Sequence, residues 1–343
     1  MQESATQLEA FLRQLPKVEL HLHLEGSVEP ETLQELSRAK GRLERETRDW
    51  ISERAQQKYR YKDFQDFLQA FKLVTLLLET PSDYAMATAR LIEGLANQNV
   101  KYAEIIFAAG VVLWKKQPLE AIFEAAASAA RTAQEVFGVR VQWIFDAIRH
   151  FGVDHTREVM LWAGRLREMG VVALGIGGDE ARGPAELFRE VFSEARGMGL
   201  HVVAHAGEAC GPESVRQAVE ALGAERIGHG LTAARNPAVL ALLCDRRIPL
   251  EVCLTSNVAT GALGRIEDHP LPQFLDAGLV VTLNTDDPAM FGTDLVNEYL
   301  LAARTFHLTR EQILGLARNA VRAAFLSEEE KLSLLSMMRS PAW

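Results

Sequence analysis

Cysteine is scarce in this chain of 343 residues, and the three that occur exclude several structural devices. Cys210, Cys244 and Cys253 form no CxxC pair, so cysteine-based zinc motifs are absent. Their number also implies no disulfide framework. A chain with so little cysteine is expected in a reducing compartment, and we predict a cytoplasmic location.

Long apolar runs and an excess of positive charge are also missing. No segment approaches the roughly 18 apolar residues of a membrane-spanning helix, so no membrane partner is expected. Residues 1–14 lack the basic start and apolar middle of a signal peptide and predict an amphipathic helix. The net charge of -9 argues against nucleic acid as a partner, because phosphate contacts need a basic surface.

Short apolar, β-branched runs alternate with longer helical segments along nearly the whole chain. We predict eight strands at residues 18–24, 100–107, 139–145, 171–176, 201–205, 226–229, 249–255 and 279–284. Helices are predicted between them at residues 119–137, 157–168, 185–198, 214–222 and 237–243. Eight strand-helix units in a chain of this length favour a (β/α)8 TIM barrel, with residues 1–343 forming a single domain, over an open sheet.

Residues 30–99 break this alternation, because the interval is too long for a single crossover. We predict that it contains several helices inserted after the first strand, which form a lid at the barrel mouth. Within it, Phe64, Phe67, Leu68 and Phe71 fall on one face of a helix. Such a stripe is usually part of a core, and the alternative is that it covers a substrate.

The most informative local pattern is His21-Leu22-His23 at the end of the first predicted strand. Residues two apart project from the same face of a strand, so both imidazoles point to one place. Taken alone, the pair fits a metal site and a pair of structural histidines equally well.

The ends of three other predicted strands also carry metal ligands, acids and bases. These residues are His205 and Glu208 after the fifth strand, His229 after the sixth, and Asp286 and Asp287 after the eighth. In an α/β barrel all strand ends share the rim on which active sites lie. Each unpaired polar group buried there would cost about 1 to 3 kcal/mol, and a shared metal ion removes that cost.

Three imidazoles and one carboxylate form the predicted ligand set, namely His21, His23, His205 and Asp286. This set suits zinc, with iron, cobalt or manganese as possible replacements. The fourth strand lacks the lysine that bridges two ions in binuclear hydrolases on this barrel, so we expect one Zn²⁺ per chain. Such an ion would lower the pKa of a bound water to about 7.

Three further residues are assigned to chemistry at this rim. Glu208 is placed to shuttle protons as a general acid and base. His229 is expected to orient the activated water, and Asp287 to bind a nitrogen of the substrate. Asp179 is expected to cap a helix. The other histidines are expected to be structural or exposed, and they are His150, His155, His201, His269 and His307.

At these positions the chain resembles the adenosine deaminase family over nearly its whole length. The motifs are PKVELHLHLEGS at 16–27, GGDE at 177–180, HAGE at 205–208, RIGHG at 226–230, TSN at 255–257 and LNTDDP at 283–288. The resemblance implies a zinc-bearing barrel that replaces the 6-amino group of an adenine-type base with oxygen and releases ammonia. A small purine nucleoside is then the expected partner.

The resemblance also implies roles for single residues. It assigns zinc binding to the four predicted ligands, places Glu208 near N1 of the base and gives His229 the orientation of the hydroxide. Asp287 matches an aspartate that contacts N7, and Gly178 matches a glycine whose amide reaches N3. The apolar stripe that begins at Phe64 resembles the family's lid over the nucleoside.

Departures from the family pattern concern the substrate. Glu25 stands where the adenosine-specific enzymes commonly have an aspartate associated with the ribose 5′-hydroxyl, and Cys253-Leu254 replaces the usual Cys-Pro. Residues 102–117 look more like deaminases of the menaquinone route, which act on aminodeoxyfutalosine. That substrate carries a benzoate-bearing group in place of the 5′-hydroxyl. Trp114, Lys115 and Arg149 are candidates to accommodate the aromatic carboxylate, and a surface position is the alternative for each.

Other functions stay open at this point. An adenine deaminase, or a mononuclear metal hydrolase of another substrate, would use the same set of residues. A catalytically inactive deaminase fold that binds a nucleoside is the non-enzymatic alternative. Its mark would be a missing ligand or proton shuttle, and none is missing from the sequence.

Overall fold

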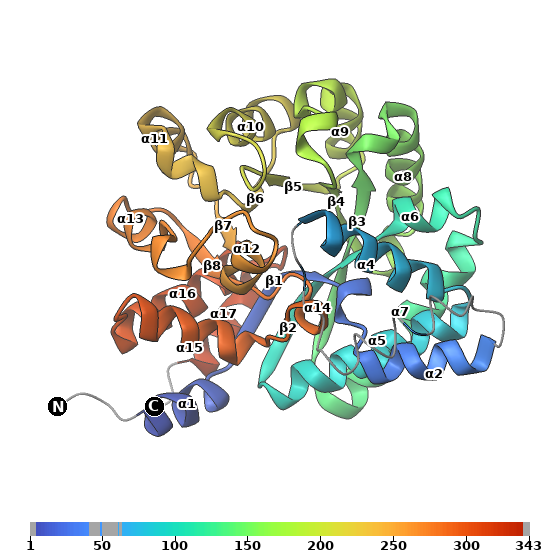
Figure 1. Cartoon of the computed structure of the whole chain (residues 1–343), viewed down its shortest axis with the longest axis horizontal. Coiled ribbons are helices and arrows are strands. Elements are labelled where there is room, and N and C mark those ends of the chain that lie inside the picture. The colour runs from blue at the N-terminus through green and yellow to red at the C-terminus, as the bar shows by residue number, and fades with distance from the viewer. Residues whose placement is uncertain (1–4, 41–48, 50–60, 62–63, 339–343) are drawn as a thin grey trace.

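Eight parallel strands form a ring at the centre of the computed structural model, which describes residues 5–40, 49, 61 and 64–338 (Figure 1). The strands follow one another around the ring in chain order. They are β1 (Lys17–His23), β2 (Val100–Phe107), β3 (Arg140–Ile148), β4 (Val171–Gly177), β5 (His201–Ala206), β6 (Arg226–His229), β7 (Leu250–Val252) and β8 (Val281–Leu283). The predicted (β/α)8 barrel is confirmed.

Helices surround this ring and cover its ends. They are α1 (Ala5–Gln14), α2 (Pro30–Lys40), α4 (Phe64–Leu77), α5 (Pro81–Asn97), α6 (Ala109–Trp114), α7 (Leu119–Phe137), α8 (Val153–Arg165), α9 (Arg189–Gly197), α10 (Pro212–Gln217), α11 (Pro237–Asp245), α12 (Leu254–Ala259), α13 (Leu271–Asp276), α14 (Pro288–Phe291), α15 (Leu295–Thr305), α16 (Arg310–Ala323) and α17 (Glu328–Met337). None of the helices in the described part of the chain is both long enough and apolar enough to cross a membrane.

The ring closes between β8 and β1 through few contacts. The Asp286 amide donates to the His21 carbonyl at 3.0 Å, and the His23 amide donates to the Asp286 carbonyl at 2.8 Å. Below them, the Leu20 amide donates to Oδ1 of Asn284 at 3.0 Å. Since β8 has only three residues, the chain just after it completes the ring. Three predicted metal ligands, His21, His23 and Asp286, and the closure of the barrel therefore depend on the same backbone.

The predicted bounds of the last strands are too long. The strand expected at 249–255 ends at Val252, because α12 begins at Leu254. The carboxylate of Glu298, on α15, accepts hydrogen bonds from the amides of Leu254 at 3.0 Å and Thr255 at 3.2 Å. A carboxylate at the first amides of a helix stabilises its beginning, and no local sequence pattern reveals this partner.

Glu298 gives rise to a prediction on stability, because this carboxylate is fully buried. Burial raises its pKa from 4.5 to about 7. The folded protein therefore holds this proton more tightly than the unfolded chain, and the free energy of unfolding falls as the pH rises from 4.5 to 7. Glutamine does not titrate, so Glu298→Gln removes this loss. From pH 5 to pH 8, the free energy of unfolding of the variant relative to that of the wild type should rise by about 3 kcal/mol.

Urea denaturation at pH 5 and pH 8 measures this difference. Glu329→Gln, at an exposed glutamate of α17, is the control and should follow the wild type at both pH values. Equal pH dependence of the wild type and Glu298→Gln would contradict the assignment.

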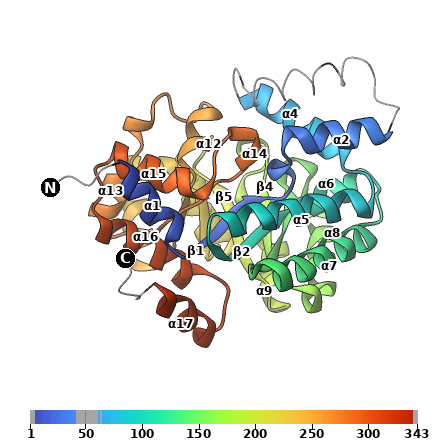
Figure 2. The same cartoon turned by 90° about the horizontal axis from the view of Figure 1, so that it is seen from below.

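The interval between β1 and β2 contains three described helices with different positions. Helix α5 packs against α7 and contacts β2, so it is the barrel helix of the first strand-helix unit. Helices α2 and α4 contact each other and lie together at one end of the barrel (Figure 2). Within the interval predicted as an insertion at 30–99, α2 and α4 are therefore the described helices that lie outside the regular strand-helix alternation.

Candidate active site

A cavity of about 380 Å³ opens at the carboxyl ends of the strands. Its floor includes the ends of β4, β5 and β6, and one wall is formed by α4. Many of the sequence-predicted site residues line it, namely His23, Phe67, Leu68, Phe71, Gly178, His205, Glu208, His229, Asp286 and Asp287. The tertiary structure thus brings together side chains from both ends of the chain.

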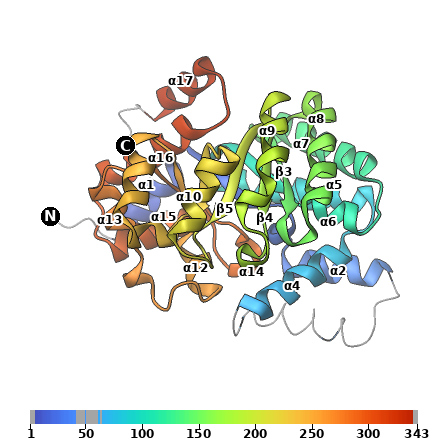
Figure 3. The same ribbon diagram turned by 90° about the horizontal axis from the view of Figure 1, so that it is seen from above.

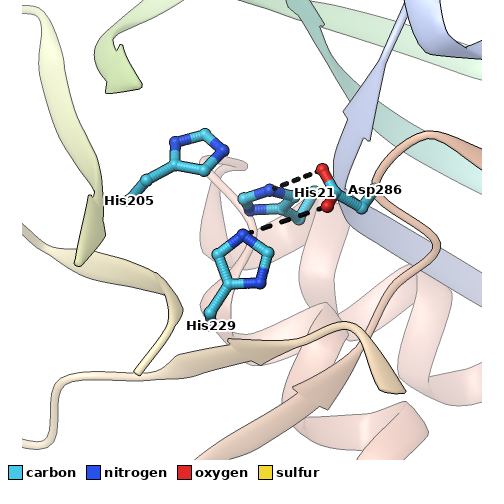
Figure 4. A group of neighbouring side chains, drawn as sticks. All are labelled: His21, His205, His229 and Asp286. Atoms are coloured by element: carbon cyan, nitrogen blue, oxygen red, sulfur yellow. Dashed lines mark ion pairs between the residues drawn. The ribbon is translucent and has the colours of Figure 1, made fainter. Parts of the chain in front are cut away.

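Four side chains at the bottom of this cavity form a tight cluster of potential metal ligands. His21, His205, His229 and Asp286 each offer one ligand atom, and these atoms lie within 4.8 Å of one another (Figure 4). The predicted ligand His23 lies beside this group. Its Nε2 is 3.2 Å from Nε2 of His205 and 3.3 Å from Oδ1 of Asp286. Four imidazoles and one carboxylate therefore meet at this point.

The distances between the predicted ligand atoms fit a single small ion. Ligand atoms bound to zinc at 2.0 to 2.1 Å in tetrahedral geometry lie about 3.4 Å apart. Oδ1 of Asp286 lies 3.3 Å from Nε2 of both His21 and His23. Nε2 of His21 is buried and lacks a hydrogen-bond partner, whereas its Nδ1 lies 2.8 Å from Oε2 of Glu251. This carboxylate orients the imidazole so that its free nitrogen faces the cluster, as second partners of metal-bound histidines do.

His229 belongs to this cluster, although it is outside the predicted ligand set. Its Nε2 is 3.7 Å from Oε2 of Glu208 and 3.9 Å from Oδ2 of Asp286. Burial lowers its pKa to about 4, so the ring is neutral near pH 7. On the other side, Nδ1 lies 3.1 Å from Nδ2 of Asn257. With this amide donating to Nδ1, the ring proton is on Nε2, which then faces the cavity as a hydrogen-bond donor.

Backbone strain is concentrated at two residues of the cluster. His229 has φ of 63° and Asp286 has φ of 65°, in the left-handed region. Such a conformation costs of order 1 to 3 kcal/mol and persists only where surrounding contacts fix it. At Asp286 one such contact is Ser256 Oγ, which donates to Oδ2 at 2.6 Å. Ser256 and Asn257, both on α12, therefore hold two cluster residues in place.

Two acids in the cavity have strongly raised pKa values. Burial, assisted by the charges of Asp286 and Glu180, raises the pKa of Glu208 to about 8. Burial and the neighbouring Asp286 also raise the pKa of Asp287 well above its usual range. Oδ1 of Asp287 is buried and has no hydrogen-bond partner. Both acids are thus protonated near neutral pH and can donate hydrogen bonds to acceptor atoms such as ring nitrogens.

The apolar stripe on α4 lies partly over the cavity and partly in a core. Phe67, Leu68 and Phe71 line the cavity. The ring of Phe67 also stacks on Phe291 of α14 at a centroid distance of 5.1 Å. The side chain of Phe64 lies outside the described part of the structure. The stripe on α4 therefore contributes both to a core and to the wall of the cavity.

Two residues predicted to bind substrate do not line the cavity. Glu25 is fully buried, and its Oε1 accepts a hydrogen bond from the Ala108 amide at 3.2 Å. Arg149 is also buried, and its guanidinium donates to the carbonyls of Gly183 at 2.9 Å and His205 at 2.6 Å. Two nitrogens of the guanidinium thus contact backbone carbonyls, one of them at the end of β5. Nε of Arg149 and Oε2 of Glu25 are buried without a hydrogen-bond partner.

Lys115 is tied to the backbone in the same way. Its Nζ donates to the carbonyls of Thr75 and Leu78 at the end of α4. A cation near the carboxyl end of a helix satisfies carbonyls that have no partner within the helix. Trp114, the neighbouring candidate, does line the cavity.

Several residues of the site were missed by sequence reasoning. Asp146 lies near the end of β3 and His150 lies just after it, and both line the cavity. His150 was expected to be structural or exposed. Glu251 interrupts the apolar strand β7, and that charge was the one signal that could have revealed it. Asp179 caps the short helix Glu180–Arg182 as predicted, by accepting from the Ala181 amide at 3.0 Å.

A parallel barrel whose strand ends carry a cluster of histidines and an aspartate is typical of hydrolases that use a bound metal ion. Comparison with known proteins agrees with this class. Residues 16–341 match the family described as adenosine deaminase, and the chain belongs to that family.

Similar proteins have more than one activity. An aminodeoxyfutalosine deaminase from Streptomyces avermitilis is 39% identical over 96% of this chain and 92% of its own length. An adenosine deaminase from Klebsiella pneumoniae is 36% identical over 94% of this chain and 97% of its own. These relatives are both nucleoside deaminases, so this chain is a deaminase of the same family.

Solved structures give the same fold. An adenine deaminase from Arthrobacter aurescens superposes with a TM-score of 0.87 at 31% identity, covering 94% of this chain and 98% of its own. An amidohydrolase from Burkholderia ambifaria with bound Zn gives a TM-score of 0.86 at 26% identity, covering 98% of this chain and 92% of its own.

Proposed function

We propose that this protein uses one zinc ion to hydrolyse the 6-amino group of an adenosine-type nucleoside, giving the 6-oxo product and ammonia. His21, His23, His205 and Asp286 would hold the ion. The observation that carries the proposal is the meeting of this donor set with two acids, Glu208 and Asp287, that line the same cavity. The zinc in the related amidohydrolase supports the choice of metal.

Each residue then has a task that its geometry allows. When bound, a zinc ion would supply a nucleophile by lowering the pKa of water to about 7. Glu208 gives its proton to N1 of the base, which draws electron density from C6. Its carboxylate then takes a proton from the attacking water and passes it to the departing amino group, and the second proton of that water restores Glu208 as the 6-oxo group forms. Asp287 donates a hydrogen bond to N7. His229, neutral and with Nε2 facing the cavity, donates a hydrogen bond beside C6.

We propose aminodeoxyfutalosine as the substrate, with adenosine as the competing candidate. The outer cavity wall contains Trp114 and Phe151, whose rings stack at 5.8 Å with 16° between their planes. Trp114 is 49% exposed, so its ring is available to a ligand. Lys72 and His150 line the same cavity and supply polar groups. An aromatic carboxylate fits a wall of this chemistry, because its ring can pack on Trp114 and its charge can face Lys72.

A steady-state assay tests the proposed function. Adenosine, deoxyadenosine, adenine and aminodeoxyfutalosine are compared as kcat/KM with fully metal-loaded protein, by the absorbance change of adenine-to-hypoxanthine conversion. Metal analysis should find one zinc ion per chain. Absence of turnover with all four compounds would contradict the proposal, and preference for adenine would favour adenine deamination.

A substitution at Trp114 separates the two nucleosides. Trp114→Ala is expected to lower kcat/KM for aminodeoxyfutalosine about tenfold, because the aryl group loses its stacking partner. The value for adenosine, which has no aryl group, should change less than twofold. Trp162→Ala, which removes a tryptophan outside the cavity lining, is the control. Equal losses for both nucleosides would contradict the proposed position of the aryl group.

A further inference from the structure

Three charged side chains form a buried column inside the barrel, below the proposed metal site. They are Glu104 on β2, Arg226 on β6 and Glu251 on β7, and each is at most 1% exposed. Nη2 of Arg226 donates to Oε2 of Glu104 at 2.6 Å, and its Nε donates to Oε1 of Glu251 at 2.5 Å. We call these three residues the charged column.

The upper end of the charged column reaches a predicted metal ligand. Oε2 of Glu251, the oxygen that Arg226 Nε does not use, lies 2.8 Å from Nδ1 of His21. Arg226 and Gly228 lie two residues apart on β6 and so face the same side of the strand. A Cβ atom on Gly228 would lie 2.6 Å from Cε1 of His21, so the glycine leaves the space that this ring occupies.

The lower end of the charged column is held by the last residue of α16 and the residues after it. Nη1 of Arg226 donates to the carbonyl of Ala323 at 3.0 Å, and its guanidinium carbon lies 3.9 Å from the centre of the Phe325 ring. The Phe325 amide donates to Oε1 of Glu104 at 2.6 Å. Figures 2 and 3 show α17, which follows this segment, at the end of the barrel away from α2 and α4.

The charges of the column are unequal. Two carboxylates face one guanidinium, so the column has one more negative charge than positive charge among buried side chains. Its upper carboxylate, Glu251, adjoins the ligand cluster, where a bound cation would balance the excess charge. Breaking such a buried pair at one partner is costly, because the remaining charge stays unpaired.

We infer that Arg226 is a positioning residue of the metal site. Nε of Arg226 fixes Glu251, and Glu251 fixes the ring of His21. The segment Ala323–Phe325 fixes Arg226 from below. The affinity for metal therefore depends on contacts at the opposite end of the barrel. This inference rests on the metal site of the proposed function, but it concerns metal binding and not the substrate.

Arg226→Lys tests the inference, because lysine keeps the positive charge but lacks the planar guanidinium with its three donor nitrogens. A single ammonium cannot occupy the positions of three guanidinium nitrogens. Metal affinity is measured without substrate, by competition of zinc with a chromophoric chelator, and Co²⁺ spectra report the geometry of the ligands. We expect a 10- to 100-fold loss of affinity, the usual effect of removing a second partner of a ligand. In metal-saturated protein kcat should fall while KM stays within twofold.

Lys17→Met is the matched control. Lys17 is another fully buried cation on a barrel strand, and its Nζ donates to the carbonyls of Leu12 and Leu15, both at 2.6 Å. Its loss should lower the free energy of unfolding and leave metal affinity within twofold of the wild type. Wild-type metal affinity in folded Arg226→Lys would overturn the inference, and so would an equal loss of affinity in both variants.

Two further variants keep the test decisive if Arg226→Lys does not fold. Glu251→Gln should lose metal affinity at least tenfold, because one amide oxygen cannot serve both Arg226 and His21. Phe325→Leu, which removes only the ring beneath the guanidinium, should lose affinity by a few fold. Wild-type affinity in both would overturn the inference. The variants could change metal affinity as expected while the wild-type protein deaminates none of the four compounds. That result would refute the proposed function and leave the inference standing.

Discussion

Replacing Glu208 with glutamine is expected to lower kcat by two to four orders of magnitude and to leave metal binding intact. The amide has nearly the same shape as the protonated acid but cannot transfer a proton, and general acid and base catalysis contributes a factor of this size. Glu208 is outside the predicted ligand set, so its loss removes no metal ligand. The side chain also contacts Thr260, whose Oγ1 donates to Oε1 at 3.4 Å, and glutamine can keep this bond.

A variant of a neighbouring carboxylate is the control for Glu208→Gln. Glu180 is buried and accepts hydrogen bonds from the amides of Glu208 at 3.3 Å and Cys210 at 2.7 Å, without lining the cavity. Glu180→Gln should therefore lower kcat less than tenfold. Metal content is measured in each variant. A Glu208→Gln protein that turns over at the wild-type rate would exclude Glu208 as the proton shuttle.

Replacing Asp286 with alanine is expected to abolish stoichiometric metal binding, and with it activity. Asp286 is the one carboxylate of the predicted ligand set, and its Oδ1 lies 3.3 Å from both His21 and His23. Without it, the ion would lose an anionic ligand in a buried site. Dialysis against a metal buffer followed by metal analysis measures the loss, and we expect less than one tenth of an ion per chain where the wild type retains one.

Asp286→Asn separates the effect of losing a carboxylate ligand from the effect of backbone strain at this position. Asparagine tolerates the left-handed conformation at φ of 65°, whereas alanine does not, so the asparagine variant should be more stable to urea than the alanine variant. Its amide oxygen can still accept from Ser256. Both variants should bind metal more weakly than the wild type. Full metal occupancy in folded Asp286→Ala would exclude this residue as a ligand.

Periodicity in the sequence predicts the barrel because the signal is local. The runs that became β4 and β5 are short, largely apolar and bounded by turns, and a buried strand needs little more than that. The ends of β7 and β8 were less predictable. Helix α12 begins at Leu254 because Glu298, 44 positions farther along the chain, accepts from its first amides. Contacts of this kind leave no local pattern.

The candidate site also has features that local sequence predicts and features that it does not. The ligand and acid residues follow predicted strands, and parallel strands in a barrel must end on one rim, so the sequence alone brings His21, His205 and Asp286 to one place. The direction of a side chain beyond a strand end does not follow from that rule. Arg149 and Glu25 are close to the rim in sequence, but both side chains are buried and contact backbone groups outside the cavity lining.

The sequence by itself thus determined the class of fold, the rim that carries the chemistry and the residue types available there, because each depends on local periodicity and on the order of the strands. Only the tertiary structure decided which polar residues face the cavity, which of them are held by a second partner, and that the charged residues within β2, β6 and β7 meet as one column. The physical reason is that hydrogen bonds and charge pairs between distant strands depend on distances that no stretch of sequence records.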